Sequence, residues 1–467
     1  MEMAGRGETR QSAPPGAWPP LHRLARRARG VIDRVLEIES ASGLLLVTVA
    51  VIAMAWANSP WADSYVRLWD TPVGVRVGPL VFERSLAWFV NDVVMVVFFF
   101  VAGLEIRREM HDGELSEWRR AALPAIAALG GMVVPALIYL AIAGDPLTRP
   151  GWGTPVATDI AFAVGILSIL GRRVPPALRV LLLALAVIDD VGAIVVIAVF
   201  YTSGVEATGL AIAGTAVATI LAMQAAGVRS SLAYVPPAAV AWAGTYLAGV
   251  HPTIAGVVVG LMTPVRAWWL PSDLRGALTG ALDRLGDSRN PGRSQDVADP
   301  ARAVALAARE ARSPVARHAE RLQPWVAYGI MPAFALANAG VAISAGGLDG
   351  PAARVVAGVA VGLVVGKPIG VLIACALAIR LGVAALPTGL GWRHLVVLGA
   401  VAGVGFTMSL FVAQLAFADP YLLAGAKSGT LAGSVVAAVV GIGIGRILLE
   451  DPRRATAGGG GGRSTSA

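Results

Sequence analysis

The chain has 467 residues, of which 56% are hydrophobic and only 15% are charged, and its mean hydropathy is +0.68. A soluble domain carries about one quarter charged residues, so this composition excludes an ordinary soluble protein. Apolar stretches of spanning length recur from Ser42 almost to the C-terminus. They are continuous and do not alternate with a period of two, so we expect an all-α polytopic membrane protein and not a β-barrel.

The formal net charge of +8 at pH 7 comes mostly from arginines in short loops and in the two tails. Positive-inside topology explains this distribution better than nucleic-acid binding does. We therefore expect a lipid bilayer around the chain and no nucleic-acid partner. The single cysteine, Cys375, lies in an apolar stretch, which excludes intrachain disulfides and thiolate metal clusters.

About twelve segments have the length of a membrane-spanning helix. Arginines precede the first segment and follow the second, fourth, sixth and last, whereas opposite loops such as "YTSGVE" and "GVHP" lack Lys and Arg, so both termini are expected in the cytoplasm. The arginine-rich stretch 23–29 resembles the start of a signal peptide, but the following apolar segment is long and lacks a strong cleavage pattern, so we expect it to be retained. The expected spans are 42–59, 86–105, 121–143, 154–171, 176–201, 206–226, 231–249, 251–265, 324–343, 352–379, 393–417 and 426–449.

The chain divides into a cytoplasmic N-terminal extension (1–40), a membrane domain (41–450) and a disordered cytoplasmic tail (451–467). Within the membrane domain, "TPVGVRVGPLVFER" alternates apolar and polar residues around a Gly-Pro pair. It predicts a β-hairpin outside the bilayer at about 71–84. A cytoplasmic insertion at about 266–323 mixes charges with an alanine-rich helical pattern, which favours amphipathic helices on the membrane surface.

Four ionisable residues lie deep in the expected spans: Asp159, Asp189, Asp190 and Lys367. Each such charge costs roughly 2.5–3.5 kcal/mol at the bilayer centre on insertion scales, and such residues usually mark ion or proton pathways. A purely structural Asp–Lys pair would account for one acid but would leave at least one of the three acids uncompensated. Adjacent helical residues point about 100° apart, so Asp189 and Asp190 are expected to have different partners. One would pair with Lys367 and the other would face a water-filled cavity.

Carboxylates and other oxygen ligands suit a hard cation, so sodium binding at these acids would compete with protonation. No cluster of His and Cys in the sequence suggests a transition metal, and there is no phosphate-binding Gly-Lys loop or metal-binding His pair. The sequence therefore predicts a transporter rather than an enzyme, and it predicts no cofactor.

Glycine, proline and threonine interrupt the expected fourth and eleventh spans. The stretch "GWGTPVATDIAF" precedes and includes Asp159, and "GAVAGVGFTMSL" covers residues 399–410. Beside an intramembrane charge, such residues favour interrupted helices whose half-helix dipoles point into the bilayer. Asp159 would then compensate positive helix ends and Lys367 negative ones. The third to fifth and tenth to twelfth spans would form two units of inverted topology.

The sequence fits two other classes of membrane protein less well. An intramembrane aspartyl protease also places two acids in the bilayer, but on separate helices with a Gly-x-Gly-Asp motif, and "GVGF" has Phe406 where that aspartate would stand. A channel would show flux without proton countertransport. A carrier of organic solutes would usually show more polar residues in its pocket.

The chain resembles the NhaA-type sodium/proton antiporters. The matching stretches, in the order of the family, are "FFVAGLEIRRE", "PVATDIAFAVGIL", "RVPPALRVLLLALAVIDDVGAIVVIAVFYT", "GVHPTIAGVVVG", "PWVAYGIMPAFALANAG", "GKPIG" and "GVGFTMSLFVAQLAF". They cover most of residues 40–449, and "ATDIAFA" together with "IDDVGAI" is specific to the family.

The resemblance implies a role for each polar residue of the spans. It places Asp189, Asp190 and Thr158 at the Na⁺ and H⁺ site, with Asp190 exchanging the ion and Asp189 paired with Lys367. Asp159 and Lys367 would compensate charge where the interrupted helices cross.

Further positions match residues that the family uses in its pH response. Glu105, Arg108 and Glu109 match such positions at the cytoplasmic mouth, although a solvated ion-pair cluster at a helix end is an equally good interpretation. His251 matches a histidine linked to pH dependence, and a simple helix cap is the more economical interpretation of it. Asp92 matches another polar membrane position of weaker effect.

From the resemblance we expect an antiporter that exchanges cytoplasmic Na⁺, and also Li⁺, for external H⁺, for sodium and pH homeostasis. Exchange is expected to be electrogenic, because two carboxylates take up two protons for one cation, and regulated by pH. The chain is expected to lie in the bacterial inner membrane and to form a homodimer through the external hairpin.

Overall fold

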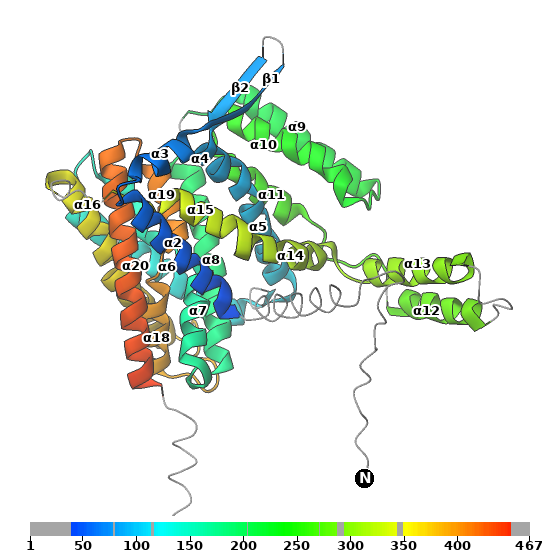
Figure 1. Ribbon diagram of the computed structural model, residues 1–467. Helices are drawn as coiled ribbons and strands as arrows, with labels where there is room; N and C mark the ends of the chain where they lie inside the picture. Colours follow the sequence, from blue (N-terminus) through cyan, green and yellow to red (C-terminus); the bar gives the residue numbers. More distant parts are fainter. Residues whose placement is uncertain are drawn as a thin grey trace, which may run out of the picture.

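The computed structural model describes residues 39–77, 80–113, 116–202, 204–269, 271–286, 294–342 and 349–449. The expected N-terminal extension and C-terminal tail therefore lie outside the described residues, apart from the first residues of α2 (Glu39–Ala57). Helices make up most of the described chain, which also contains one two-stranded sheet (Figure 1).

Six helical segments of the described chain are long and apolar enough to cross a membrane. This confirms a helical polytopic membrane protein, since a spanning helix needs about 20 apolar residues. The segments are α4–η1–α5 (Leu86–Asp112), α6 (Trp118–Ile142), α8 (Pro176–Phe200), α9 (Ala207–Ala225), α16–η7–α17 (Gly350–Arg380) and α20 (Pro420–Leu448).

Three further helix pairs pass the same test of length and hydropathy, but each pair is sharply bent. The pair α2 and α3 (Ala62–Asp70) bends by 111°, η3 (Arg149–Val156) and α7 (Ile160–Leu170) by 41°, and α18 (Trp392–Ala402) and α19 (Phe406–Ala416) by 48°. Six to nine spans are thus established by length and composition. The count of twelve stays a prediction, because α10 (Val235–Leu247) and α11 (Thr253–Met262) are shorter than a full span.

Three π-helical turns interrupt the described helices, and wide turns of this kind often occur at functional sites. They are η1 (Phe89–Val94), η6 (Val326–Ile330) and η7 (Gly362–Gly366). The segment η6 joins α14 (Pro314–Trp325) to α15 (Met331–Asn338), and η7 leads directly into Lys367, the first residue of α17. The short segments η4 (Gly171–Arg173) and η5 (Ser231–Tyr234) are 3₁₀ turns that precede α8 and α10.

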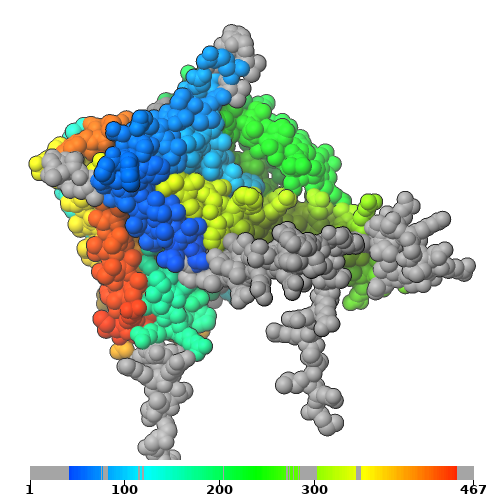
Figure 2. Space-filling model, viewed as in Figure 1, coloured from blue at the N-terminus to red at the C-terminus, as the bar shows by residue number. Residues whose placement is uncertain are grey.

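The two strands form a hairpin that protrudes from the helical body (Figures 1 and 2). β1 (Pro72–Val77) pairs antiparallel with β2 (Leu80–Ser85), and Pro72 lies opposite Ser85. The expected Gly-Pro turn at 78–79 lies outside the described residues. Ser85 then caps α4, because its hydroxyl accepts a hydrogen bond from the Trp88 N–H at 3.2 Å.

The segment 266–323 contains three helices. α12 (Pro271–Gly286) and α13 (Ser294–Glu310) pack against each other and extend sideways from the body, whereas α14 leads back toward it and contacts α5 (Figure 1). Residues 287–293, between α12 and α13, lie outside the described chain.

Small residues let the helices of the body approach closely. α6 and α17 meet at Gly130 and Gly370, where a Cβ atom on either residue would collide with the carbonyl oxygen of the other. Such small-residue contacts are the usual packing of membrane helices, where hydrophobic burial drives helix association less than in water. Close packing brings α17, which carries Lys367, against α6 and α18.

Candidate functional site

Asp189 and Lys367 form a buried ion pair within the helical body. Both residues are 0% exposed, and Asp189 Oδ2 lies 2.6 Å from Lys367 Nζ. Asp189 stands in the middle of α8, and Lys367 follows the π-helical turn η7. The structure thus places Lys367 against Asp189, the partner that the resemblance implied.

Thr158 joins this pair. Lys367 Nζ donates a hydrogen bond to the Thr158 hydroxyl, whose oxygen lies 2.5 Å from Asp189 Oδ2 and 3.1 Å from the Ala402 carbonyl oxygen. A hydroxyl has one hydrogen to donate, so it serves one of these two acceptors at a time. Ala402 ends α18, so Thr158 connects the ion pair to the break between α18 and α19.

Asp190 is nearly as buried as its neighbour, at 6% exposed, but among the described residues the ion pair with Lys367 belongs to Asp189 alone. The Asp190 Oδ1 atom has no hydrogen-bond partner among the described residues, and the same holds for Asp189 Oδ1. Asp189, Glu105, Asp159 and Lys367 all act on Asp190 electrostatically. Asp189 and Asp190 thus both interact with the positive charge of Lys367. A buried carboxylate oxygen without a partner is unfavourable unless a cation or a proton binds it.

Asp159 binds the N-terminal ends of two helices. Its Oδ1 accepts a hydrogen bond from the Phe162 N–H of α7 at 3.1 Å. Its Oδ2 accepts one from the Thr407 N–H of α19 at 3.1 Å and lies 2.5 Å from the Thr407 hydroxyl. An anion between two helix N-termini is stabilised by both helix dipoles. Asp159 therefore lies where its carboxylate can compensate the positive ends of both α7 and α19. Lys367, in contrast, has its hydrogen bonds to Asp189 and Thr158.

The break between α18 and α19 fits closely against its neighbours. The Asp159 N–H donates to the Val404 carbonyl at 2.8 Å, which joins the two bent helix pairs through their backbones. A Cβ atom on Gly403 would lie 2.6 Å from the Leu363 carbonyl oxygen of η7, so only glycine fits there without a shift. Thr407 was missed as a site residue from sequence, although it stands in the glycine-rich stretch that signalled the break.

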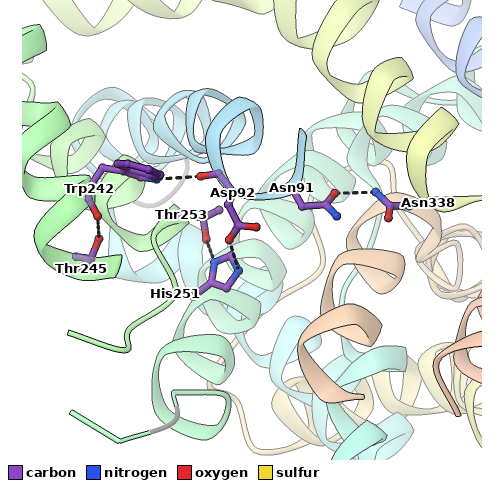
Figure 3. Close-up of polar contacts among 7 residues, drawn as sticks. All are labelled: Asn91, Asp92, Trp242, Thr245, His251, Thr253 and Asn338. Atoms are coloured by element: carbon purple, nitrogen blue, oxygen red, sulfur yellow. Dashed lines mark hydrogen bonds and ion pairs between the residues drawn. The ribbon is translucent and has the colours of Figure 1, made fainter. Parts of the chain in front are cut away.

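A second polar cluster surrounds Asp92 of η1 (Figure 3). The Asp92 carboxylate lies 3.5 Å from His251 Nε2, and His251 Nδ1 lies 2.7 Å from the Thr253 hydroxyl. Trp242 Nε1 donates to the Asp92 carbonyl at 2.9 Å. His251 is therefore part of a cluster that links η1, α10 and the start of α11.

Amide side chains extend polar contacts from the neighbouring residue of η1. Asn338 Nδ2, on α15, donates to Asn91 Oδ1 at 2.8 Å (Figure 3) and to the Phe334 carbonyl at 3.0 Å. Gln414 of α19 donates to Asn338 Oδ1. These amides bridge three elements far apart in sequence. Sequence reasoning missed them because, unlike charges, single amides in apolar segments carry no strong signal.

Glu105, Arg108 and Glu109 lie near the other end of α5 from η1. Glu105 interacts electrostatically with Arg108 and Glu109, and it also acts on Asp190. Glu105 is half-buried, whereas Arg108 is exposed. Glu105 therefore links this end of α5 electrostatically to Asp190, whereas His251 contacts Asp92 near the opposite end.

Oxygen atoms dominate the site, which suits a hard cation. Within the described ranges, no group of three or more His, Cys, Asp and Glu residues has the arrangement of a metal centre. Beside the acids lie the Thr158 hydroxyl and, 3.1 Å from that hydroxyl, the Ala402 carbonyl oxygen at the helix break. A cation that binds here would use two adjacent carboxylates, as cargo that enters and leaves.

Comparisons with known proteins agree on one family. The sequence model described as "Na+/H+ antiporter 1" matches residues 33–444. A protein of Myxococcus xanthus named "Na(+)/H(+) antiporter NhaA 2" is 59% identical over 95% of each chain. A protein of Sorangium cellulosum with the same name is 51% identical over 94% of each chain. Another, from Pseudomonas putida, is 47% identical over 91% of this chain and 94% of its own length.

Proposed function

The chain belongs to the Na+/H+ antiporter 1 family, and from this premise we propose that it exchanges cytoplasmic Na⁺ for external H⁺ across a bacterial cell membrane. The observation that carries the proposal is the buried acid pair. Asp189 has an ammonium partner at 2.6 Å, whereas no described residue forms an ion pair with Asp190 beside it, and Asp190 Oδ1 has no hydrogen-bond partner in the described chain. That arrangement leaves Asp190 to bind the exchanged ion.

Competition between the two ions follows from the chemistry of the carboxylates. Na⁺ binds ionised carboxylates together with oxygen ligands such as the Thr158 hydroxyl, and a proton on either acid removes the charge that holds the cation. Sodium entering from the cytoplasm binds ionised acids, and protons entering from outside displace it. Alkaline conditions thus favour the binding of cytoplasmic Na⁺ at the acids, and Li⁺ is expected to use the same ligands.

Two acids take up two protons for each monovalent cation, which makes the exchange electrogenic. One net charge then crosses the membrane in each cycle. The membrane potential contributes about 2.3 kcal/mol per charge per 100 mV, in addition to the proton gradient. Protons bind both Asp190 and Asp189, and Lys367 holds the remaining carboxylate charge when one acid is neutral.

We assign the fourth and eleventh of twelve spans to the bent pairs η3–α7 and α18–α19. Their bends of 41° and 48° and the capping of both α7 and α19 by Asp159 support interrupted helices that cross there. Units of inverted topology, built from the third to fifth and the tenth to twelfth spans, are expected to rock against the rest of the body and expose the acids to each side in turn.

The orientation and the regulation follow from the same assignment. Arginine-rich loops place both termini in the cytoplasm, which puts Glu105, Arg108 and Glu109 at the cytoplasmic mouth and the hairpin outside. The electrostatic interaction of Glu105 with Asp190 supports a role of this mouth in the pH response. For His251, the contacts with Asp92 and Thr253 support a role in the pH response at the outer side.

Cation-dependent proton movement in proteoliposomes tests the proposal. With an imposed pH gradient, addition of Na⁺ or Li⁺ is expected to discharge the gradient in vesicles of the wild-type protein. Asp190→Asn is expected to abolish this response, whereas Asp70→Asn, a control at an exposed acid of α3, keeps it. Discharge that survives Asp190→Asn refutes the role of that acid. Sodium flux without proton movement identifies a channel instead. Exchange rates that do not change when a membrane potential is imposed contradict electrogenic exchange.

A further inference from the structure

A basic pocket lies at the end of the helical body that is opposite the hairpin, far from the acid pair. It has a volume of about 420 Å³, within the range of small-molecule sites. Its walls come from three places in the chain: the turn between α7 and α8, the first turn of α18 and the last turn of α20. In Figure 1 the ends of α7, α18 and α20 lie together, away from β1 and β2.

Three arginines line this pocket: Arg172, Arg173 and Arg393. None of the described residues that line it carries a carboxylate. Arg173 Nη1 donates to the Arg446 carbonyl at 2.9 Å, so this guanidinium holds the last turns of α20 against the turn before α8. The pocket thus gathers positive charge at a place where one of its own arginines, Arg173, fixes the two surrounding segments to each other.

Two helices begin at the pocket and add to its positive character. Pro176 starts the 25-residue helix α8, and Arg393 and His394 belong to the first turn of α18. Helix N-termini carry partial positive charge and favour anions. His394 Nδ1 accepts a hydrogen bond from the Gly391 N–H at 2.9 Å, so the neutral ring has its proton on Nε2 and keeps a donor there.

The pocket is chemically unsuited to the transported cation. Three guanidinium groups repel Na⁺, and Pro176 stands thirteen residues before Asp189 on α8. At 1.5 Å per residue this separation is about 20 Å along the helix axis. The pocket is therefore separate from the path of the cation, and positive-inside topology explains the side on which its arginines lie but not their convergence on one pocket.

We propose that this pocket binds a phosphate-bearing anion, supplied by the headgroup of an anionic phospholipid or by free phosphate. Guanidinium groups match phosphate oxygens in geometry and charge and bind them through paired N–H donors. Basic pockets between membrane helices at a cytoplasmic face bind anionic headgroups in this way. Arg172 and Arg393 supply the donors, and Arg173 holds the frame.

Thermal unfolding of the full-length protein in a neutral detergent tests the proposal. The whole chain is used because Glu450 and Asp451, which follow the last described residue, also carry charge. The midpoint temperature of unfolding is measured as phosphatidylglycerol or phosphatidylcholine is added to the micelles. A parallel series compares potassium phosphate with potassium chloride at equal ionic strength, without sodium.

A rise of the midpoint with phosphatidylglycerol alone identifies a lipid headgroup as the ligand, and a rise with potassium phosphate identifies free phosphate. Arg172→Gln combined with Arg393→Gln is expected to weaken the apparent affinity by at least about tenfold, because the variant loses charge-assisted hydrogen bonds to the phosphate oxygens. The double Lys variant at these positions keeps part of the response, and Arg380→Gln, at an exposed arginine outside the pocket, keeps all of it.

Three results overturn the proposal. One is that neither phosphatidylglycerol nor phosphate raises the midpoint of the wild-type protein above its zwitterionic lipid or chloride control. Another is that the double Gln variant responds with wild-type affinity. The third applies if the double variant fails to fold: Arg393→Gln alone is then measured, and an unchanged affinity in that single variant counts against the site.

Discussion

Asp189 Oδ2 and Lys367 Nζ lie 2.6 Å apart, and neither side chain is exposed. A buried pair of opposite charges contributes little net stability, because removal from water offsets most of the attraction. Loss of one partner is much worse, since the other charge then stays buried without compensation. In this chain the effect is sharpened by Asp190, whose carboxylate adds a further negative charge beside the same lysine.

Lys367→Met is therefore expected to destabilise the protein strongly, by roughly 3–5 kcal/mol. The combination of Lys367→Met with Asp189→Asn is expected to recover part of this loss, because it removes both charges of the pair. Thermal unfolding in detergent without sodium measures both variants and each single change. Strictly additive effects would show that the two residues are not coupled.

Thr407 provides the next test, because it anchors α19 to Asp159 through both its N–H and its hydroxyl. Thr407→Val keeps the shape and the backbone contact and removes only the hydroxyl. A hydrogen bond to a charged group contributes about 1.5–3 kcal/mol, so unfolding is expected to occur at a clearly lower temperature. Ser409→Ala is the matched control, since the Ser409 hydroxyl is buried on the same helix without a partner in the described chain. Equal effects of the two changes contradict the capping role of Asp159.

The chemistry of the site was largely visible in the sequence because intramembrane charges are rare. Asp159, Asp189, Asp190 and Lys367 stand out against apolar neighbours, and the glycine-rich breaks predicted where backbone groups would be free to bind them. Their mutual distances were not accessible, because α8 and α17 are nearly 180 residues apart in sequence and meet only through tertiary packing.

The residues that were missed are those whose meaning depends on a distant partner. Asn338 and Gln414 are ordinary polar residues until η1, α15 and α19 are brought together. Helix ends were also difficult to predict. The expected seventh and eighth spans, 231–249 and 251–265, correspond to α10 and α11, which are shorter because proline and glycine residues separate them from their neighbours.

The protruding hairpin predicts the oligomeric state. In the described chain β1 and β2 pair only with each other, so each strand keeps one open edge that another chain can extend. Val73 and Phe82 also expose apolar surface, at 39% and 40%. Deletion of residues 73–84 is expected to convert a homodimer into a folded monomer, measured by light scattering of the protein in detergent.

The control for this deletion is a change in the hairpin that leaves both edges intact. Arg76→Gln breaks the exposed ion pair with Glu83, whose atoms lie 3.0 Å apart. Exposed pairs contribute at most about 1 kcal/mol, so this variant is expected to remain dimeric. A deletion variant with the same mass as the wild-type assembly would assign the dimer contact to another surface.

His318 of α14 lies outside the expected spans and makes the stability depend on pH. Burial, and then the positive charges of Arg317, Arg321 and Arg309, hold the pKa of its imidazole below the ordinary value of 6.5. The unfolded chain therefore takes up a proton near pH 6.5 while folded His318 is still neutral. Because the unfolded state binds more protons, the free energy of unfolding is highest above about pH 6.5 and decreases as the pH falls toward the lower pKa of folded His318.

His318→Gln removes this titration, so its unfolding temperature is expected to fall less than that of the wild type between about pH 7 and about pH 5. Ser231→Ala is the control, because it removes only the hydroxyl 3.1 Å from His318 Nε2 and keeps the imidazole. That variant is expected to retain the wild-type dependence on pH. Parallel curves for wild type and His318→Gln would mean that the imidazole is not held neutral by the arginines around it. Other groups would then have to account for any loss of stability in acid.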